Sequence, residues 1–272
     1  MTVEYSEKHP SIVMIGAGNV ATHLGKAFHE AGCHIKMIYS RTQESAKELA
    51  ESIGCPYTTD ITSTDSDADI YIVSLKDSVL EHILPKLVKC NSKALFVHTA
   101  GSVSIDIWKG LTNRYGVLYP MQTFSKQRKV NFDNVYFFVE ANTNEDTELL
   151  IRTASLLSKY VFRASSEQRK YLHISAVFAC NFTNHMYSIC EHLLTSHGLP
   201  FGSMLPLIEE TAEKVHYLSP VQAQTGPAQR NDTNIMENHM QMLKEETEIA
   251  ELYERISKSI HKFQETNKQT SI

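Results

Sequence analysis

The chain has 272 residues, of which 42% are hydrophobic and 21% are charged, and its formal net charge is −5. A chain of this length can bury one large core or two modest ones. The negative charge, without a long basic run, argues against nucleic acid and anionic membranes as partners. No apolar run approaches the roughly 18 residues that cross a bilayer, so we expect no membrane contact.

The cysteines and histidines indicate the cellular compartment and whether a catalytic metal is expected. The five cysteines are scattered and form no Cys-x-x-Cys pair, and no His-Glu-x-x-His motif occurs. The first residues lack the charged and apolar regions of a signal peptide. We therefore expect a cytoplasmic protein with reduced thiols and no catalytic metal.

A glycine-rich turn near the amino terminus is the most informative motif. A short apolar run leads into Gly16-Ala-Gly18-Asn19-Val20-Ala21, and a helical repeat of apolar residues follows until Gly32. This strand–turn–helix pattern is the phosphate-binding corner of a dinucleotide fold. Gly16 would make the tight turn, and Gly18 would leave room for a pyrophosphate. The helix start at Asn19 and Val20 would offer N–H groups to the phosphates.

The next strand is expected over residues 35–39, and the residues that follow it indicate which nucleotide binds. Sites specific for NAD place an acidic residue there, but this chain has Ser40-Arg41-Thr42. A guanidinium beside two hydroxyls suits a 2′-phosphate, which favours NADP over NAD. The alternative is that Arg41 is an ordinary solvated residue near the helix expected over 43–52.

The first 165 residues alternate between strand and helix patterns. Strands are expected over residues 69–75, 94–97, 116–119 and 135–139, and helices over residues 43–52, 79–87 with an interruption at Pro85, and 145–158. This alternation predicts an α/β, Rossmann-like, doubly wound parallel sheet. Ligands bind beyond the carboxyl ends of such strands, so we expect Ser74 and Lys76 to contact the cofactor and Gln122 to contact the substrate.

Residues 166–272 carry almost no strand signal and predict an all-helical domain. Helices are expected over residues 167–197, 204–217 and 233–263, with a polar, turn-rich segment over 219–232. Residues 174–182 are apolar almost all round, which indicates burial in a core or against a partner subunit. We expect a homodimer built through this helical domain.

Several motifs in this order resemble one protein family. They are the Gly16 corner, His98-Thr-Ala-Gly-Ser, Tyr119-Pro-Met-Gln-Thr-Phe, the helix from Ala176 to Asn184, and Thr225-Gly-Pro-Ala-Gln-Arg-Asn-Asp. The chain resembles the Rossmann-like proteins with a DUF2520 domain, relatives of pyrroline-5-carboxylate reductase and of the β-hydroxyacid and 6-phosphogluconate dehydrogenases. The resemblance implies an NADP-type domain and a helical domain, like that of 6-phosphogluconate dehydrogenase, that often dimerises. The family more often has His where this chain has Tyr119.

The same resemblance identifies candidate catalytic residues. In the β-hydroxyacid dehydrogenases, a Lys and an Asn on one helix handle the proton and the carbonyl oxygen. Here the matching helix has Asn181 but no matching Lys, and His173 lies eight residues earlier, close to the same helix face. His98 ends a central strand near the expected nicotinamide. The alternatives are that Asn181 and His173 only pack against neighbours and that His98 only braces its turn.

Arg230 is the candidate for holding an anionic group of a small-molecule substrate, with Asn184 as a further contact. The alternative for Arg230 is a helix-capping ion pair with Asp232 or Glu237.

Together these features predict an NADP-dependent oxidoreductase acting on a small polar carbonyl, imine or hydroxyacid. Two alternatives remain. One is a true pyrroline-5-carboxylate reductase, although residues 176–183 are bulkier than the Gly- and Ser-rich stretch of those enzymes. The other is a non-catalytic sensor of NADP or a metabolite.

Overall fold

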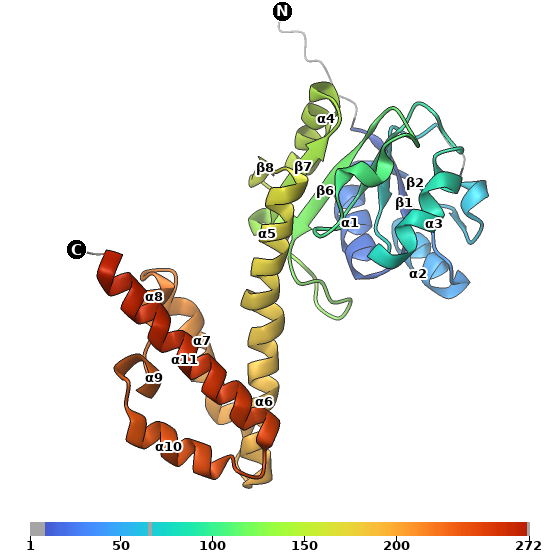
Figure 1. Ribbon diagram of the computed structural model, residues 1–272. Helices are drawn as coiled ribbons and strands as arrows, with labels where there is room; N and C mark the ends of the chain where they lie inside the picture. The colour runs from blue at the N-terminus through green and yellow to red at the C-terminus, as the bar shows by residue number, and fades with distance from the viewer. Residues whose placement is uncertain (1–8, 65–66, 271–272) are drawn as a thin grey trace, which may run out of the picture. The chain divides into compact units, whose positions relative to one another are not determined.

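The structure is a computed structural model that describes residues 9–64 and 67–270, with side chains through residue 267 (Figure 1). The segment on which the signal-peptide prediction depends lies outside these residues. The chain divides into two compact units, one ending at Asn181 and one beginning at Phe182. The sequence predicts a boundary after residue 165, which lies before α5 (Ser166–Ala176). In the structure α5 is attached to the first unit, so the division falls after this helix.

An eight-stranded sheet forms the centre of the first unit, in the order β3-β2-β1-β4-β5-β6-β7-β8. The pairs from β3 to β6 and the pair β7–β8 are parallel, whereas β6 and β7 are antiparallel. The strands are β1 Ser11–Ile15, β2 His34–Tyr39, β3 Tyr57–Thr58, β4 Ile70–Val73, β5 Leu95–His98, β6 Tyr115–Met121, β7 Tyr136–Ala141 and β8 Val161–Arg163. The predicted Rossmann-like class is confirmed, and the short strands β3 and β8 are additions to it.

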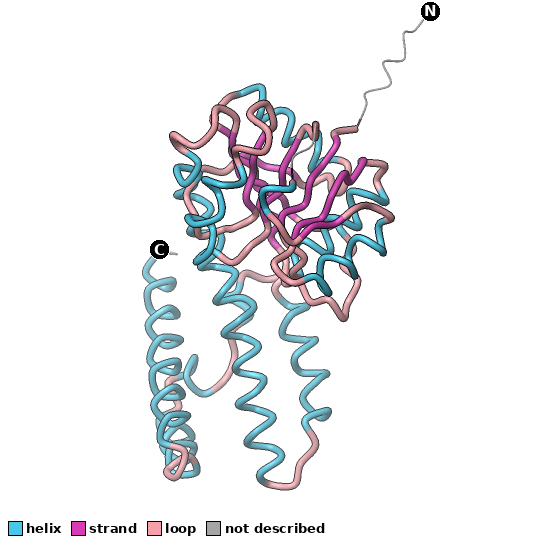
Figure 2. Tube along the Cα trace, turned by 90° about the vertical axis from the view of Figure 1, so that its right-hand side faces the viewer, coloured by secondary structure: helices cyan, strands magenta, loops and turns pink. Residues whose placement is uncertain are grey.

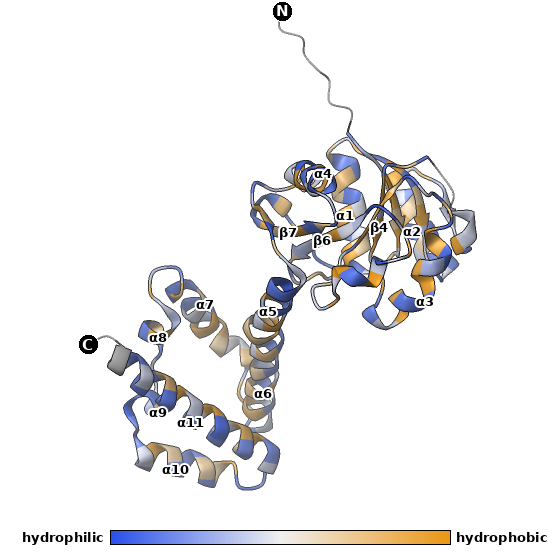
Figure 3. Cartoon of the chain, turned by 45° about the horizontal axis from the view of Figure 1, so that its top comes forward, coloured by the Kyte–Doolittle hydropathy of each residue, from blue (hydrophilic) through white to orange (hydrophobic). Residues whose placement is uncertain are grey.

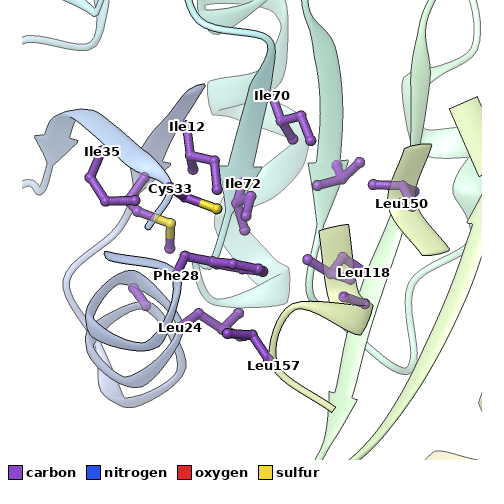
Figure 4. Close-up of a cluster of buried hydrophobic side chains, with 14 of the residues drawn as sticks. Ile12, Leu24, Phe28, Cys33, Ile35, Ile70, Ile72, Leu118, Leu150 and Leu157 are labelled. Carbon is purple, nitrogen blue, oxygen red and sulfur yellow. The ribbon is translucent and has the colours of Figure 1, made fainter. Parts of the chain in front are cut away.

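Helices cover both faces of this sheet (Figure 2). They are α1 Asn19–Glu30, α2 Gln43–Ile53, α3 Asp77–Leu87 and α4 Asn144–Ser155. Alternate residues of β1 point to opposite faces, so Ile12 and Val13 belong to different hydrophobic clusters. In the first cluster, Phe28 of α1 packs beside Ile12 and Ile72 (Figure 4). The sheet is therefore buried on both faces, as the continuous apolar strands predict.

The expected interruption at Pro85 does not occur. Pro85 lies inside α3, which continues to Leu87. Leu84 and Leu87 are fully buried in the second hydrophobic cluster. Their burial holds the last helical turn in place, although Pro85 removes one backbone donor from it.

The remaining α- and π-helices follow α5 in the chain, and they correct the sequence expectations at two places. They are the π-helix Val177–Phe182, α6 Thr183–Ser196, α7 Leu205–Lys214, α8 Pro220–Ala223, α9 Pro227–Arg230, α10 Thr233–Met242 and α11 Thr247–Thr270. The single helix expected over 233–263 breaks between α10 and α11, which fold back so that His239 Nδ1 and Tyr253 Oη lie 2.8 Å apart. The turn-rich segment contains α8 and α9, each begun by a proline at a position that needs no donor.

The helical unit has almost no core of its own. Of its described residues, only Ala228, Leu243 and Ala250 are buried apolar side chains. Apolar residues recur along α6 and α11 (Figure 3), and Phe178 and Phe182 are 63% and 49% exposed. The apolar stretch 174–182 is thus not buried within one chain. No helix in the described part is both long and apolar enough to cross a membrane.

Candidate active site

The turn between β1 and α1 has the geometry of a nucleotide-binding corner. Gly16 has φ +123°, and a Cβ there would lie 2.4 Å from the backbone oxygen of Ser74. Only glycine fits this conformation and this close approach of β1 to the end of β4. Gly16 N also donates to the backbone oxygen of Tyr39 at 2.7 Å, which ties the corner to the end of β2.

Gly18 has a different role, because its surroundings are open. No described atom lies within 4 Å of the Cβ that a larger residue would carry at this position. Gly18 is the N-cap of α1, a fully described helix with no capping side chain and no acidic residue in its first turn. The N–H groups at Asn19 and Val20 therefore keep their capacity to bind an anion. An open cradle at an uncapped helix start fits a pyrophosphate.

The residues after β2 fit the ribose end of the nucleotide. Arg41 and Thr42 are exposed, and Ser40 is buried with its N–H donating to the backbone oxygen of Thr58. Thr42 is the N-cap of α2, but within the described chain its hydroxyl caps no backbone N–H. Burial raises the pKa of Tyr39, and the Arg41 guanidinium opposes this effect, which places Arg41 near the Tyr39 hydroxyl.

A carboxylate that the sequence analysis did not consider also lies near Tyr39. Asp60 acts on the pKa of Tyr39 in the direction opposite to Arg41. Its carboxylate accepts from Thr62 N at 2.9 Å and from Thr62 Oγ1 at 2.7 Å. These bonds, with one from Ser63, lower the pKa of Asp60. Asp60 is therefore engaged in capping its own turn, which disfavours it as an acceptor for ribose hydroxyls.

The loops after β4 and β5 meet beside Gly16. Ser74 Oγ accepts from Thr99 Oγ1 at 3.1 Å, and the Ser102 hydroxyl donates to Asp77. Lys76 is exposed at the N-cap of α3. Ser74 and Lys76 thus stand at the carboxyl edge of the sheet, where the sequence analysis expected cofactor contacts.

His98 is buried at the end of β5, with only 1% of its surface exposed. Its Nδ1 accepts from Ala100 N at 3.2 Å, and its ring stacks on Trp108 with centroids 6.3 Å apart. Burial, reinforced by the Arg169 guanidinium, lowers the pKa of His98 to about 3. The ring is therefore neutral near pH 7, and its contacts favour the alternative in which it braces the turn.

Arg169 is a buried residue that the sequence analysis missed. This residue of α5 is fully buried, and its Nη1 lies 2.6 Å from Glu140 Oε2 of β7. Its Nη2 donates to the backbone oxygen of Val103 at 2.9 Å and to Ser166 Oγ at 3.1 Å. Burial lowers the pKa of Arg169, and Glu140 opposes this shift. The network fixes the start of the long helix that carries His173 and Asn181.

His173 and Asn181 are both exposed on that helix. The π-helix Val177–Phe182 lies between α5 and α6 and includes Asn181. In an α-helix, residues eight apart are offset by about 80° around the axis. A π-helix accommodates one extra residue, which reduces this offset. The irregularity therefore turns Asn181 towards the face of His173, and π-turns often mark functional sites.

The remaining candidates are distributed over both units. In the first unit, Gln122 is exposed after β6, and its side-chain oxygen accepts from Thr123 N at 2.7 Å. In the helical unit, Asn184 and Arg230 are exposed, and Arg230 forms no ion pair among the described residues. Asp232 caps α10 through Ile235 N instead of pairing with Arg230. The described residues contain no group of three or more His, Cys, Asp or Glu that could hold a metal ion.

Comparison with protein families gives two matches. Residues 135–260 match the family described as a domain of unknown function, DUF2520. Residues 11–101 match the family described as NADP oxidoreductase, coenzyme F420-dependent. The second match covers the corner at Gly16 and supports NADP as the cofactor, as predicted. Among curated proteins, none matches the chain significantly.

Solved structures extend the comparison to the whole chain. A "putative NADP oxidoreductase" from Bacteroides fragilis is 52% identical, with a TM-score of 0.89, and the match covers 94% of this chain and 99% of that one. An imine reductase from Myxococcus stipitatus in complex with NADP+ is 14% identical, with a TM-score of 0.67 and coverage of 96% and 95%. A 1-pyrroline-5-carboxylate reductase from Streptococcus pyogenes is 15% identical, with a TM-score of 0.63 and coverage of 94% and 99%. The last two share the fold. The chain belongs to the same family as the Bacteroides fragilis protein, and its residues 135–260 carry the DUF2520 domain.

Proposed function

We propose that this protein is an NADP-dependent oxidoreductase acting on a small polar carbonyl, imine or hydroxyacid. The observation that carries the proposal is the open position of Gly18 at the uncapped start of α1. The exposed guanidinium of Arg41, with the nearby Asp60 carboxylate already engaged in its own turn, supports NADP over NAD. When bound, NADPH would supply a hydride, and the protein must bind the substrate and manage one proton.

We assign the proton and the substrate oxygen or nitrogen to His173 and Asn181. Both side chains are exposed, and the extra residue that a π-helix accommodates reduces the angular offset between their two positions, which supports this assignment. A histidine can donate a proton near neutral pH, and an amide can bind a carbonyl oxygen. His98, which is buried and neutral, is then a positioning residue for the β5 turn, as Arg169 is for α5.

The substrate's anionic group would be held by Arg230, with Asn184 and Gln122 as further polar contacts. The guanidinium of Arg230 is exposed and has no ion-pair partner within the described part of the chain, which supports this role, because a carboxylate or phosphate can accept two of its N–H groups. The fold shared with imine and pyrroline-5-carboxylate reductases supports a C=N or C=O substrate. The free thiols of all five cysteines support a cytoplasmic location.

We also propose that the protein is a homodimer. Neither hydrophobic cluster contains a residue of the helical unit. That unit has an apolar groove of about 310 Å³, lined by residues of α6, α9 and α11 that include Ile189, Leu193 and Ile256. A helical unit without a core needs apolar surface from elsewhere, and a second copy with the same exposed helices would supply it.

Steady-state NADPH oxidation against a panel of imines, ketoacids and semialdehydes tests the proposed function. We expect turnover of at least one class. Asn181→Ala should lower kcat with little change in NADPH affinity, because Asn181 would contact the substrate. Lys170→Ala, an exposed change on the same helix, is the matched control. Tight NADPH binding without turnover of any class would favour the sensor alternative. Absence of NADPH binding would contradict both.

A further inference from the structure

Two side chains of α1 hold the loop that follows β6. Asn19 Nδ2 donates to the backbone oxygen of Phe124 at 2.9 Å, and His23 Nε2 lies 2.9 Å from the backbone oxygen of Ser125. Because a carbonyl oxygen can only accept, His23 must carry a proton on Nε2 in this contact. Asn19 and His23 are four residues apart, so one helix face binds two consecutive peptide carbonyls.

The ring of Phe124 adds an apolar contact at the same point. It lies 5.5 Å from the His23 ring and 6.1 Å from the Phe132 ring, measured between centroids. His23 is buried, with 9% of its surface exposed. A buried histidine that donates its Nε2 proton to a loop carbonyl acts as a fixed attachment, because losing the bond would leave a buried imidazole N–H without a partner.

Beyond Ser125 the loop separates from α1. A cavity of about 870 Å³ lies between them, with Lys26 and Glu30 on one side and Lys129 on the other. The ion pair between Lys129 and Glu30, with 3.3 Å between Nζ and Oε1, is exposed and contributes little stability. The attachment of the loop to α1 is therefore concentrated at Asn19 and His23.

Both ends of this attachment belong to the proposed site. The first turn of α1 is where a pyrophosphate would bind, and the loop begins at Gln122, a proposed substrate contact. β6 runs parallel to β5, so the loop starts at the same carboxyl edge as the other site residues. We infer that His23 is a positioning residue that couples nucleotide binding at the start of α1 to the order of the loop carrying Gln122. This inference depends on the proposed NADP site.

Amide hydrogen exchange of the loop peptide over residues 122–131, with and without saturating NADP+, tests the coupling. In the wild-type protein, NADP+ should slow exchange at the loop by roughly fivefold or more, the lower range of typical couplings between sites. In His23→Ala, NADP+ measured by calorimetry should still bind, but the slowing at the loop should largely disappear. His23→Gln keeps an N–H donor and should restore part of it.

His29→Ala is the matched control, because His29 is exposed on the same helix. This variant should show the wild-type slowing. Normal NADP+ binding to the wild type without slower exchange at the loop would overturn the coupling alone, even if His23→Ala did not fold. Equal slowing in the wild type and in His23→Ala would also overturn it. Absence of NADP+ binding to the wild type would instead overturn the proposed function on which the coupling depends.

Discussion

Arg169 of α5 and Glu140 of β7 form an ion pair, 2.6 Å between Nη1 and Oε2, in which the guanidinium is completely buried. The pair ties the helix that carries the candidate catalytic residues to the sheet that carries the nucleotide corner. Removing one partner of a buried pair leaves the other charge uncompensated.

Arg169→Ala should therefore lower the free energy of unfolding by about 3–5 kcal/mol. Part of this loss comes from the Glu140 carboxylate of β7, which would no longer have a cationic partner. Chemical denaturation followed by circular dichroism measures the effect. Lys170→Ala, at the exposed neighbouring position, should change stability by less than about 0.5 kcal/mol. Similar stabilities for the two variants would show that the Arg169 network has no anchoring role.

The two glycines of the corner should respond differently to substitution. Gly18→Val places its side chain in open space, so the protein should fold normally and lose nucleotide binding. Gly16→Ala forces a Cβ to within 2.4 Å of the Ser74 oxygen at φ +123°, so it should destabilise the fold itself. Thermal melts and calorimetric titration with NADP+ separate the two effects. Unchanged affinity in Gly18→Val would place the nucleotide elsewhere.

Arg41 should determine the preference for NADPH over NADH. Loss of a charged hydrogen bond costs roughly 1.5–3 kcal/mol, so Arg41→Ala should weaken NADPH binding by about tenfold or more. Binding of NADH, which lacks the 2′-phosphate, should change little. Fluorescence titration with both nucleotides measures this ratio. Equal losses for the two nucleotides would contradict the assignment of Arg41 to the 2′-phosphate.

Local sequence patterns predicted the nucleotide domain well because its signals are local. The apolar runs of β1, β4 and β5 and the glycine turn each lie within a few neighbouring residues. The two-residue strand β3 and the three-residue strand β8 are too short to show a period. The break between α10 and α11 was missed because the helical spacing of apolar residues continues through Leu243.

The candidate site was predicted less completely, because burial depends on distant partners. Arg169 lies in a polar helix start, Ser165-Ser-Glu-Gln-Arg, which resembles a solvated surface. Its burial results from Glu140, 29 residues earlier in the chain. Similarly, nothing near His98 in the sequence indicates that its ring would stack on Trp108 or that the Arg169 guanidinium would lower its pKa. Local patterns show which residues could do chemistry, but tertiary contacts determine their protonation and exposure.

The burial of His98 should make stability depend on pH. Its pKa is about 3 in the folded protein, whereas an unfolded histidine has a pKa of about 6.5. Between these values the unfolded chain binds a proton that the folded chain does not, so His98 favours unfolding as the pH falls from about 6.5 towards 3. The slope contributed by one such group is at most about 1.4 kcal/mol per pH unit.

Denaturation of His98→Gln at several pH values measures this contribution. Near pH 7 the variant should have a lower free energy of unfolding than the wild type. This free energy should then decline less steeply in the variant as the pH falls. His29→Gln, at an exposed position, should retain the wild-type slope. An NMR titration of the His98 ring in the wild-type protein gives a direct check. A midpoint near 6.5 would contradict the buried, neutral state.

The proposed dimer gives the last prediction. Light scattering of the wild-type protein at micromolar concentration should give twice the mass of one chain. Phe178, 63% exposed and close to the exposed Phe182, lies on the apolar stretch that we expect a second copy to cover. Phe178→Glu should therefore yield monomers, because a charge buried in an apolar interface costs several kcal/mol.

Tyr57→Glu provides the comparison, because Tyr57 is a 37% exposed aromatic residue on the short strand β3 of the sheet unit. This variant should remain a dimer. The helical unit should also lose stability in the Phe178→Glu monomer, since its described residues form no hydrophobic cluster of their own. A wild-type protein that is monomeric and fully helical in circular dichroism would contradict this account, because its exposed apolar helices would then be stable without any partner.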